Sequence, residues 1–310
     1  MAILPEVAVA GEIFVDLIFS GLDAWPEPGK EIFARSFHRD VGGGTAITAC
    51  ALSTFGTSCA IFACIGEDAG DWITERLRGF GVETDTLYLE AAEPTAITVA
   101  ATQPHERAFL TYAGANQFFE ARFAAAVRSG TRVAGRHVHL AYAPEIGMAA
   151  EVLDELHAQG CSVSLDVGWR EGWLSDSRAV EVLRKVDIFF PNEAEAARMS
   201  HLQDAKAMLE WFAGRGIERV VLKLGAKGAA MLWDGRIEFA NGCRATAIDT
   251  TGAGDCFNAG FLNAWLKGRD PQACLHAANL CGALSTESIG GLNALGSTSW
   301  RKMIRAKEAE

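Results

Sequence analysis

Residues 249–260 read DTTGAGDCFNAG, a polar turn with two glycines that leads directly into an apolar segment compatible with a helix. At a helix start the backbone N–H groups have no intrahelical acceptor, and the helix dipole is positive there. Such a turn attracts anions and suits a phosphate group. We therefore expect the fold to present a phosphate site at this point.

Asp255 lies at the mouth of this turn. A carboxylate beside a phosphate is unfavourable unless it has a task there. The natural task is to accept the proton of a hydroxyl that attacks the phosphate. Acids are also common in the first turn of ordinary helices, so the other segments of the chain must decide whether Asp255 has a catalytic or a structural role.

The composition excludes several classes of protein. The chain has 310 residues, of which 49% are hydrophobic, and its net charge is −11. The acidic balance argues against nucleic acid or an anionic membrane as a partner. The eight cysteines form no CxxC pair and no zinc-type spacing with the histidines, as expected in a reducing cytosol.

The first residues, MAILPE, lack the features of a signal peptide, and no window reaches the roughly 18 apolar residues of a membrane span. We therefore expect a cytoplasmic protein.

The remaining chain alternates between strand-like and helix-like segments, which predicts an α/β fold with a mostly parallel sheet and helices on both faces. Apolar runs typical of buried strands occur at 7–10, 59–65, 138–141, 163–167, 188–190 and 220–224. Helix-like segments occur at 46–54, 71–78, 149–158, 205–213, 255–266, 271–286 and 298–306.

Two regions interrupt this alternation. Residues 31–41 form an extended segment, and strands at 95–102 and 107–112 flank a hairpin turn at 103–106. Strands without crossover helices do not belong in a parallel core. We expect them to form a small β lid beside it. A further hairpin is predicted at 229–239, with its turn at Asp234-Gly235.

The DTTGAGD run resembles the C-terminal signature of the ribokinase-like (PfkB) family of sugar kinases, and the resemblance covers essentially the whole chain. It implies a three-layer α/β/α fold in a single domain, 1–310, with a β lid from about 12–40 and 95–113. It also implies a homodimer formed through the lid. No Walker A pattern occurs, which excludes a P-loop kinase.

On the acceptor side, the family places a backbone contact with the sugar at Gly42, Gly43 and Gly44, although glycine runs also form plain turns. Asp16 matches an acid that binds sugar hydroxyls. Ile47 departs from the family, which usually has an asparagine at this position. This loss of a polar group leaves the identity of the substrate open.

Residues 166–170 read DVGWR and resemble a DxNxR stretch of many family members, with Gly168 in place of the asparagine. In relatives that act on keto-deoxy sugar acids, the arginine contacts the substrate carboxylate. Arg170 is the matching residue, and a surface ion pair is the alternative.

For the nucleotide, residues 222–228 resemble the family's nucleotide loop, in which Gly225 and Gly228 let ATP pass closely and Lys223 reaches a phosphate. Asn279 matches an asparagine that many relatives place beside the adenine. An ordinary polar position on a helix is the alternative.

For the ions, Asn192 and Glu195 match the family's NxxE motif and would organise Mg²⁺ through water. The same pair also fits a helix capping box. Asp249 and Thr251 match the site of a monovalent cation, K⁺.

Together these features predict an ATP-dependent kinase that transfers the γ-phosphoryl group to a primary alcohol of a sugar or sugar acid. Asp255 is the base, and the N–H groups of Gly252, Ala253 and Gly254 stabilise the transferred group. A nucleoside kinase of the same family and a non-catalytic sugar or nucleotide sensor are the alternatives.

Overall fold

The structure is a computed structural model that describes residues 4–103 and 107–308. Within this part of the chain, nine strands form a central sheet in the order β13-β12-β11-β10-β9-β8-β1-β4-β5. Neighbouring strands are parallel except for the β11-β12 and β12-β13 pairs. The strands are β1 (Val7–Gly11), β4 (Cys59–Gly66), β5 (Leu87–Glu90), β8 (His137–Ala141), β9 (Ser162–Leu165), β10 (Ile188–Phe189), β11 (Arg219–Lys223), β12 (Gly228–Trp233) and β13 (Arg236–Asn241).

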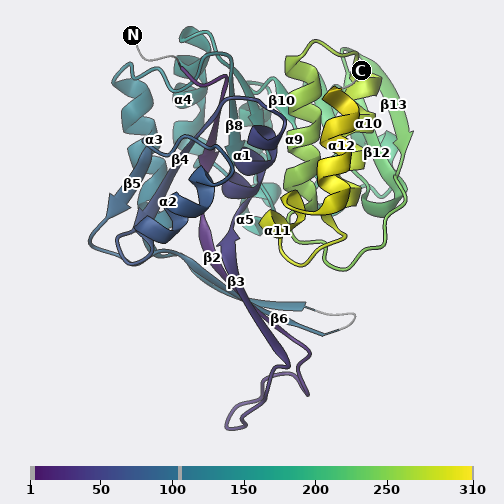
Figure 1. The fold of residues 1–310 in the computed structure, drawn as a ribbon. Coiled ribbons are helices and arrows are strands. Elements are labelled where there is room, and N and C mark those ends of the chain that lie inside the picture. The colour runs from purple at the N-terminus through teal and green to yellow at the C-terminus, as the bar shows by residue number, and fades with distance from the viewer. Residues whose placement is uncertain (1–3, 104–106, 309–310) are drawn as a thin grey trace.

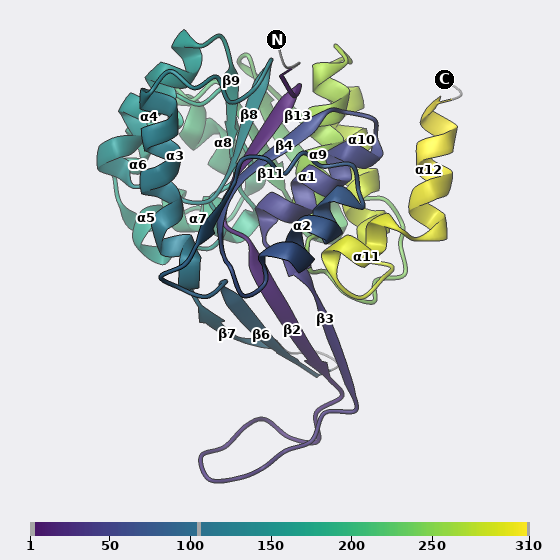
Figure 2. The same cartoon turned by 60° about the vertical axis from the view of Figure 1, so that its left-hand side comes forward.

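Helices cover both faces of this sheet (Figures 1 and 2). One face carries α1 (Gly44–Thr54), α2 (Gly70–Arg78), α9 (Ala253–Leu266), α10 (Pro271–Ser285), α11 (Gly291–Leu295) and α12 (Thr298–Glu308). The other face carries α3 (Phe119–Arg128), α4 (Ile146–Ala158), α5 (Glu171–Ser175), α6 (Ala179–Leu183), α7 (Glu193–Ser200) and α8 (Ala205–Ala213).

The alternation of side chains along the strands explains the two layers. In β1, Val7 and Val9 belong to the apolar cluster on one face, whereas Ala8 and Ala10 belong to the cluster on the other. All four side chains are completely buried. A strand that is covered on both faces must be apolar throughout, which is why these strands appear as continuous apolar runs in the sequence.

A second sheet projects from one end of the core (Figure 2). Its order is β3-β2-β6-β7, and its strands are β2 (Phe14–Ser20), β3 (Ser36–Gly42), β6 (Ile97–Thr102) and β7 (Arg107–Tyr112). β6 and β7 pair antiparallel, as the hairpin prediction requires. Most of the predicted turn, residues 104–106, lies outside the described residues.

The predicted α/β/α fold with its lid sheet is confirmed, whereas the single-domain boundaries 1–310 stay a prediction. Several elements differ in extent from the prediction; α4, for example, begins at Ile146 rather than at residue 149. Strand β3 begins at Ser36, so residues 31–35 of the predicted extended segment lie before it. The β2-β3 ladder ends where Ser20 pairs with Ser36, because the chain turns at Gly21. Helix α9 begins at Ala253, two residues before the predicted start. In the described part of the chain, no helix is long and apolar enough to cross a membrane.

Candidate active site

The glycine-rich turn lies at the N-terminus of α9. Gly252 precedes the helix with φ 76°, a left-handed conformation that favours glycine. Gly254 is the second residue of the helix, where backbone N–H groups have no intrahelical acceptor. The Ala253 N–H donates to the Thr250 carbonyl at 3.2 Å, so a bound phosphate would share or replace this bond.

Asp255 is the third residue of α9 and faces the glycine run that precedes α1. A Cβ added at Gly44 would lie 2.8 Å from Asp255 Oδ1, so a side chain at this position would displace the carboxylate. Burial raises the pKa of Asp255 to about 6; Asp166 adds to the rise and Lys223 opposes it. A carboxylate with this pKa is a stronger base than an ordinary aspartate and is still mostly ionised at pH 7.

Asp16 lies on β2 against Gly42, where a Cβ would approach its carboxylate to 2.0 Å. Burial, together with the charges of Asp40, Asp249 and Asp255, raises the pKa of Asp16 to about 7. Gly43, with φ 94°, packs on the Glu12 carbonyl. The three glycines therefore let the side chains of Asp16 and Asp255 and the carbonyl of Glu12 approach the loop closely.

A narrow pocket separates the lid from the turn before α9. It is lined by Asp16, Ile18, Thr98, Ala100, Thr102, Phe109, Asp249 and Thr251. Asp16 and the predicted cation residues thus meet in one place. Ile47 packs on the far side of the turn, against Gly252 and Gly291, and a Cβ at Gly252 would lie 2.8 Å from its methyl group.

Arg170 does not line this pocket. Its guanidinium pairs with Glu12, and it borders a separate open cavity beside α4 and α5. The neighbouring Asp166 also has partners of its own, since its Oδ2 accepts from Lys223 at 2.6 Å and from the Asn258 amide at 2.6 Å. Burial disfavours the charged form of Asp166, but Lys223 and Asn258 outweigh it and hold its pKa below the usual range.

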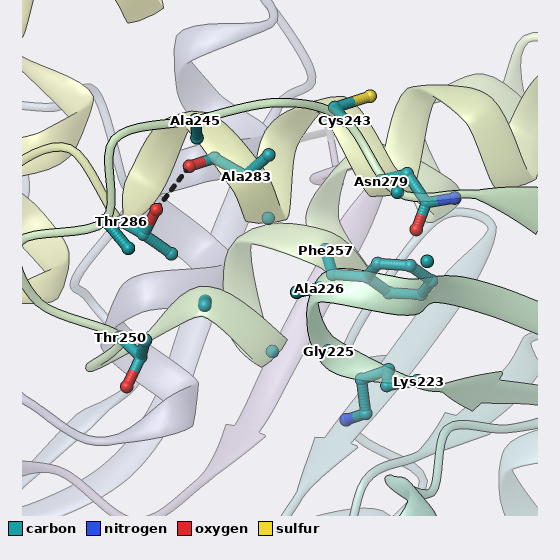
Figure 3. Close-up of a pocket in the computed structure, with 16 residues that line it drawn as sticks. Lys223, Gly225, Ala226, Cys243, Ala245, Thr250, Phe257, Asn279, Ala283 and Thr286 are labelled. Atoms are coloured by element: carbon teal, nitrogen blue, oxygen red, sulfur yellow. Dashed lines mark hydrogen bonds between the residues drawn. The ribbon is translucent and has the colours of Figure 1, made fainter.

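A larger pocket of about 270 Å³ lies on the other side of the turn before α9 (Figure 3). It contains all four residues predicted for the nucleotide: Lys223, Gly225, Gly228 and Asn279. The sequence did not single out Phe257, Ala283, Thr286 or the loop 242–247, which also line it. Phe257 follows Asp255 by two residues, and an aromatic side chain so close to the turn was the signal in the sequence that could have identified it.

The orientation of Asn279 is fixed by the core. Its amide nitrogen donates to the carbonyls of Ala240 and Asn241 at 3.3 and 3.2 Å. Its oxygen consequently points into the pocket, toward the ring of Phe257 (Figure 3). A hydrogen-bond acceptor therefore faces the pocket.

Asn192 and Glu195 form the capping box of α7. The Glu195 carboxylate accepts from the Asn192 backbone N–H at 2.8 Å and from its side-chain amide at 2.7 Å. Burial, and then Asp166, raise the pKa of Glu195 to about 7. The described residues contain no cluster of three His, Cys, Asp or Glu side chains that would hold a metal directly. The magnesium role of Asn192 and Glu195 stays a prediction.

Asp249 forms two hydrogen bonds that stabilise the loop between β13 and α9. Its carboxylate accepts from the Thr251 N–H at 2.8 Å and from the Gly290 N–H at 2.9 Å. These bonds join the turn to the segment before α11. The cation role of Asp249 and Thr251 stays a prediction.

The model of the pfkB family carbohydrate kinases matches residues 4–297. The chain belongs to this family. An ATP-dependent ribose-1-phosphate kinase of Halopiger xanaduensis is 30% identical over 94% of this chain and 95% of its own. A ribokinase of Haemophilus influenzae is 26% identical over 93% of this chain and 94% of its own. This pfkB kinase is therefore a phosphotransferase that uses an alcohol group as acceptor.

Among solved structures, Arabidopsis thaliana ribokinase complexed with ribose and ATP superposes with a TM-score of 0.83 at 26% identity. The superposition covers 98% of this chain and 99% of that chain. The relatives act on both neutral and phosphorylated sugars, so the family leaves the acceptor open.

Proposed function

We propose that this kinase transfers the γ-phosphoryl group of ATP to a primary alcohol of a sugar or sugar acid. One observation carries the proposal: the turn before α9 separates two pockets. Thr250, Ala253 and Gly254 line the larger pocket, and Asp249 and Thr251 line the smaller one. A phosphoryl group on this turn would face a nucleotide on one side and an acceptor on the other.

Asp255 would take the proton of the attacking hydroxyl, because it lies on this turn and its pKa is near neutral. The N–H groups of Gly252, Ala253 and Gly254 would stabilise the charge on the transferred group. Lys223 would contact a phosphate, since a Cβ at Gly254 would lie 3.5 Å from its ammonium nitrogen. Gly225, Gly228 and Asn279 would hold the rest of the nucleotide.

Mg²⁺ would be held through waters by Asn192 and Glu195, and it supplies positive charge to the phosphates. K⁺ would lie beside Asp249 and Thr251. Asp16 and Gly42 to Gly44 would hold the acceptor under the lid, which excludes water from the reaction. All eight cysteines are free thiols, which supports a location in the cytoplasm.

A nucleoside acceptor is the second candidate. Phe109 lines the smaller pocket from the lid and is 61% exposed, so its ring is free to stack on a base. The acceptor panel below decides between a free sugar and a nucleoside.

We also propose a homodimer formed through the outer face of the lid. Leu17, Val99 and Leu110 lie side by side on this face, and Phe37 packs against Phe19 beside them. Leu110 is 73% exposed, and a partner lid would bury it. Leu110→Asp should give monomers in light scattering, whereas Leu89→Asp, an exposed apolar position in β5 of the core sheet, should not.

The function is tested by coupled ADP release from ATP and Mg²⁺ over a panel of ketoses, aldoses, sugar acids and nucleosides. The Asp255→Asn variant is measured in parallel. We expect one acceptor class to release ADP and the variant to abolish that release. Nucleotide binding with no release from any acceptor would reject the kinase proposal in favour of a sensor.

A further inference from the structure

The ammonium group of Lys223 lies against the turn before α9 and is held there by a carboxylate. Lys223 is the last residue of β11 and lines the larger pocket, and its Nζ atom donates to Asp166 Oδ2 at 2.6 Å. Both side chains are largely buried, with 12% and 11% of their surface exposed. A Cβ at Gly254 would lie 3.5 Å from the same nitrogen, so the ammonium is close to the backbone of the turn.

The carboxylate of Asp166 is fixed by donors from three parts of the fold. Lys223 on β11 and the Asn258 amide on α9 both donate to Oδ2 at 2.6 Å. The Gly168 N–H, in the loop after β9, donates to Oδ1 at 3.2 Å. A carboxylate that accepts bonds on both oxygens from separate elements has little freedom to rotate. The fold therefore sets the point at which Lys223 is anchored.

Asn258 serves this cluster as a donor. It is completely buried and lies three residues after Asp255 on α9. Its side-chain oxygen has no hydrogen-bond partner within residues 4–103 and 107–308. Burying an unpaired amide oxygen is unfavourable, and turning the amide over would place this oxygen against the Asp166 carboxylate. The bond that Asn258 donates to Asp166 must outweigh this cost.

The charge of Lys223 also depends on Asp166. Burial by itself lowers the pKa of Lys223, but Asp166, followed by Glu195, outweighs it and raises this pKa above its usual value. His139 lies near Asp166 as well, but burial lowers its pKa to about 4, so it is neutral at pH 7. Without Asp166, Lys223 would lose both its fixed position and a large part of the field that keeps it charged.

We propose that Asp166 and Asn258 are positioning residues that hold the ammonium of Lys223 against the turn before α9, where it meets a phosphate of the nucleotide. The inference rests on the proposed kinase function and adds two residues to its nucleotide side. The described residues that line the two pockets do not include Asp166, so it acts through Lys223. A lysine that is already held in place loses less side-chain freedom when a phosphate binds.

Calorimetric titration with ATP and Mg²⁺ tests the inference through the Kd of ATP, which requires no turnover. Lys223→Met should raise this Kd by at least about tenfold, the usual effect of one charged hydrogen bond. Asp166→Asn, which keeps the size of the side chain, should raise it by a similar factor. The combined variant should stay within about twofold of Lys223→Met, because Asp166 has no effect on ATP once Lys223 is absent.

Asp234→Asn is the matched control. Asp234 pairs with Arg219 at 2.8 Å, and Arg219 is the first residue of β11, at the opposite end of the strand from Lys223. This variant also removes the carboxylate partner of a cation on β11, but away from the turn. It should leave the Kd of ATP within about twofold of the wild type. A loss as large as that of Asp166→Asn would overturn the role of Asp166.

Asn258→Leu is the second variant, and it decides the question if Asp166→Asn does not fold. It keeps the Lys223–Asp166 pair but removes one of the donors that fix the carboxylate, and it should raise the Kd of ATP by roughly threefold. An unchanged Kd in Asn258→Leu would overturn the role of Asn258 and, where Asp166→Asn does not fold, the whole inference.

The remaining outcomes separate this inference from the kinase function. Unchanged or tighter ATP binding by Asp166→Asn overturns the inference alone, as does a combined variant that loses a further tenfold beyond Lys223→Met. ATP binding with no turnover of any acceptor rejects the kinase function alone, and the Kd values of the variants still decide the role of Asp166. Failure of the wild type to bind ATP rejects both.

Discussion

The two pockets on either side of the turn before α9 are built differently. The larger pocket, which we propose for the nucleotide, belongs entirely to the core and is lined mainly by glycine, alanine and other small groups. The smaller pocket, which we propose for the acceptor, is shared between core and lid, and side chains with charges and hydroxyls line it. A ligand common to a whole family can be held by backbone and shape, whereas the choice of acceptor needs particular side chains. Four predictions test this difference.

The largest effect is expected where the two sides meet. Asp255→Asn should lower kcat by at least ~10²-fold, because the acceptor hydroxyl loses its base. ATP affinity should stay within about threefold, since the nucleotide pocket is unchanged. Steady-state kinetics and calorimetry measure both. Asp204→Asn, which keeps the N-cap of α8, is the control. Equal kcat for the wild type and Asp255→Asn would show that Asp255 is not the catalytic base.

The second-largest effect is expected for the ion pair between Lys223 and the buried Asp166. Lys223→Met leaves Asp166 buried without its cation and should lower the free energy of unfolding by about 2 kcal/mol. Lys227→Met removes a lysine that pairs with Glu193 at the surface and should change it by less than about 0.5 kcal/mol. Urea denaturation of the two variants measures the difference. Equal losses would show that the Lys223–Asp166 pair contributes no more than a surface pair.

The pH dependence follows from the raised pKa of Asp255, about 6. The ionised carboxylate is the base, so kcat/KM should fall as pH drops through 6. At pH 5 it should be at least roughly tenfold lower, one decade per pH unit below the pKa, and protonation of Asp16, whose pKa is about 7, adds to the fall. A profile that stays level down to pH 4.5 would indicate an ordinary aspartate and contradict the burial of this group.

The smallest effect is expected for the recognition of the adenine ring of ATP. The Asn279 oxygen presents an acceptor, which matches the amino group of adenine and opposes the oxygen of guanine. Asn279→Leu should reduce the preference for ATP over GTP by about fivefold, the value of one neutral hydrogen bond. His276→Ala, an exposed position on the same helix, should not change it. An unaltered preference for ATP over GTP in Asn279→Leu would show that Asn279 does not select the nucleobase.

The sequence predicted the layers because strands such as β1 are apolar on both faces, which leaves an unmistakable pattern. It also predicted the turn before α9, because the whole DTTGAGD run resembles a family signature, whereas an acid at a helix start alone would not have decided its role. Strand β5 and helix α11 were missed, because LYLE and GLNAL are too short to show a period.

Pairings between distant residues were also beyond the sequence. The sequence left open whether Arg170 contacts the substrate or forms a surface ion pair, and it grouped Asp166 with Arg170 as one motif. In the structure they have separate partners, Glu12 and Lys223, at sequence separations of 158 and 57 residues. Spacing within a motif says which residue types are near each other along the chain, but the fold decides which charges they meet.

The most direct test of the central claim follows the transfer itself by ³¹P NMR, with ATP, Mg²⁺ and the best acceptor from the panel. With the wild type, a phosphomonoester signal should grow in step with ADP. With Asp255→Asn, both signals should be absent over the same time while ATP remains bound. Ester formation by the variant at the wild-type rate would contradict the account, as would release of inorganic phosphate without any ester.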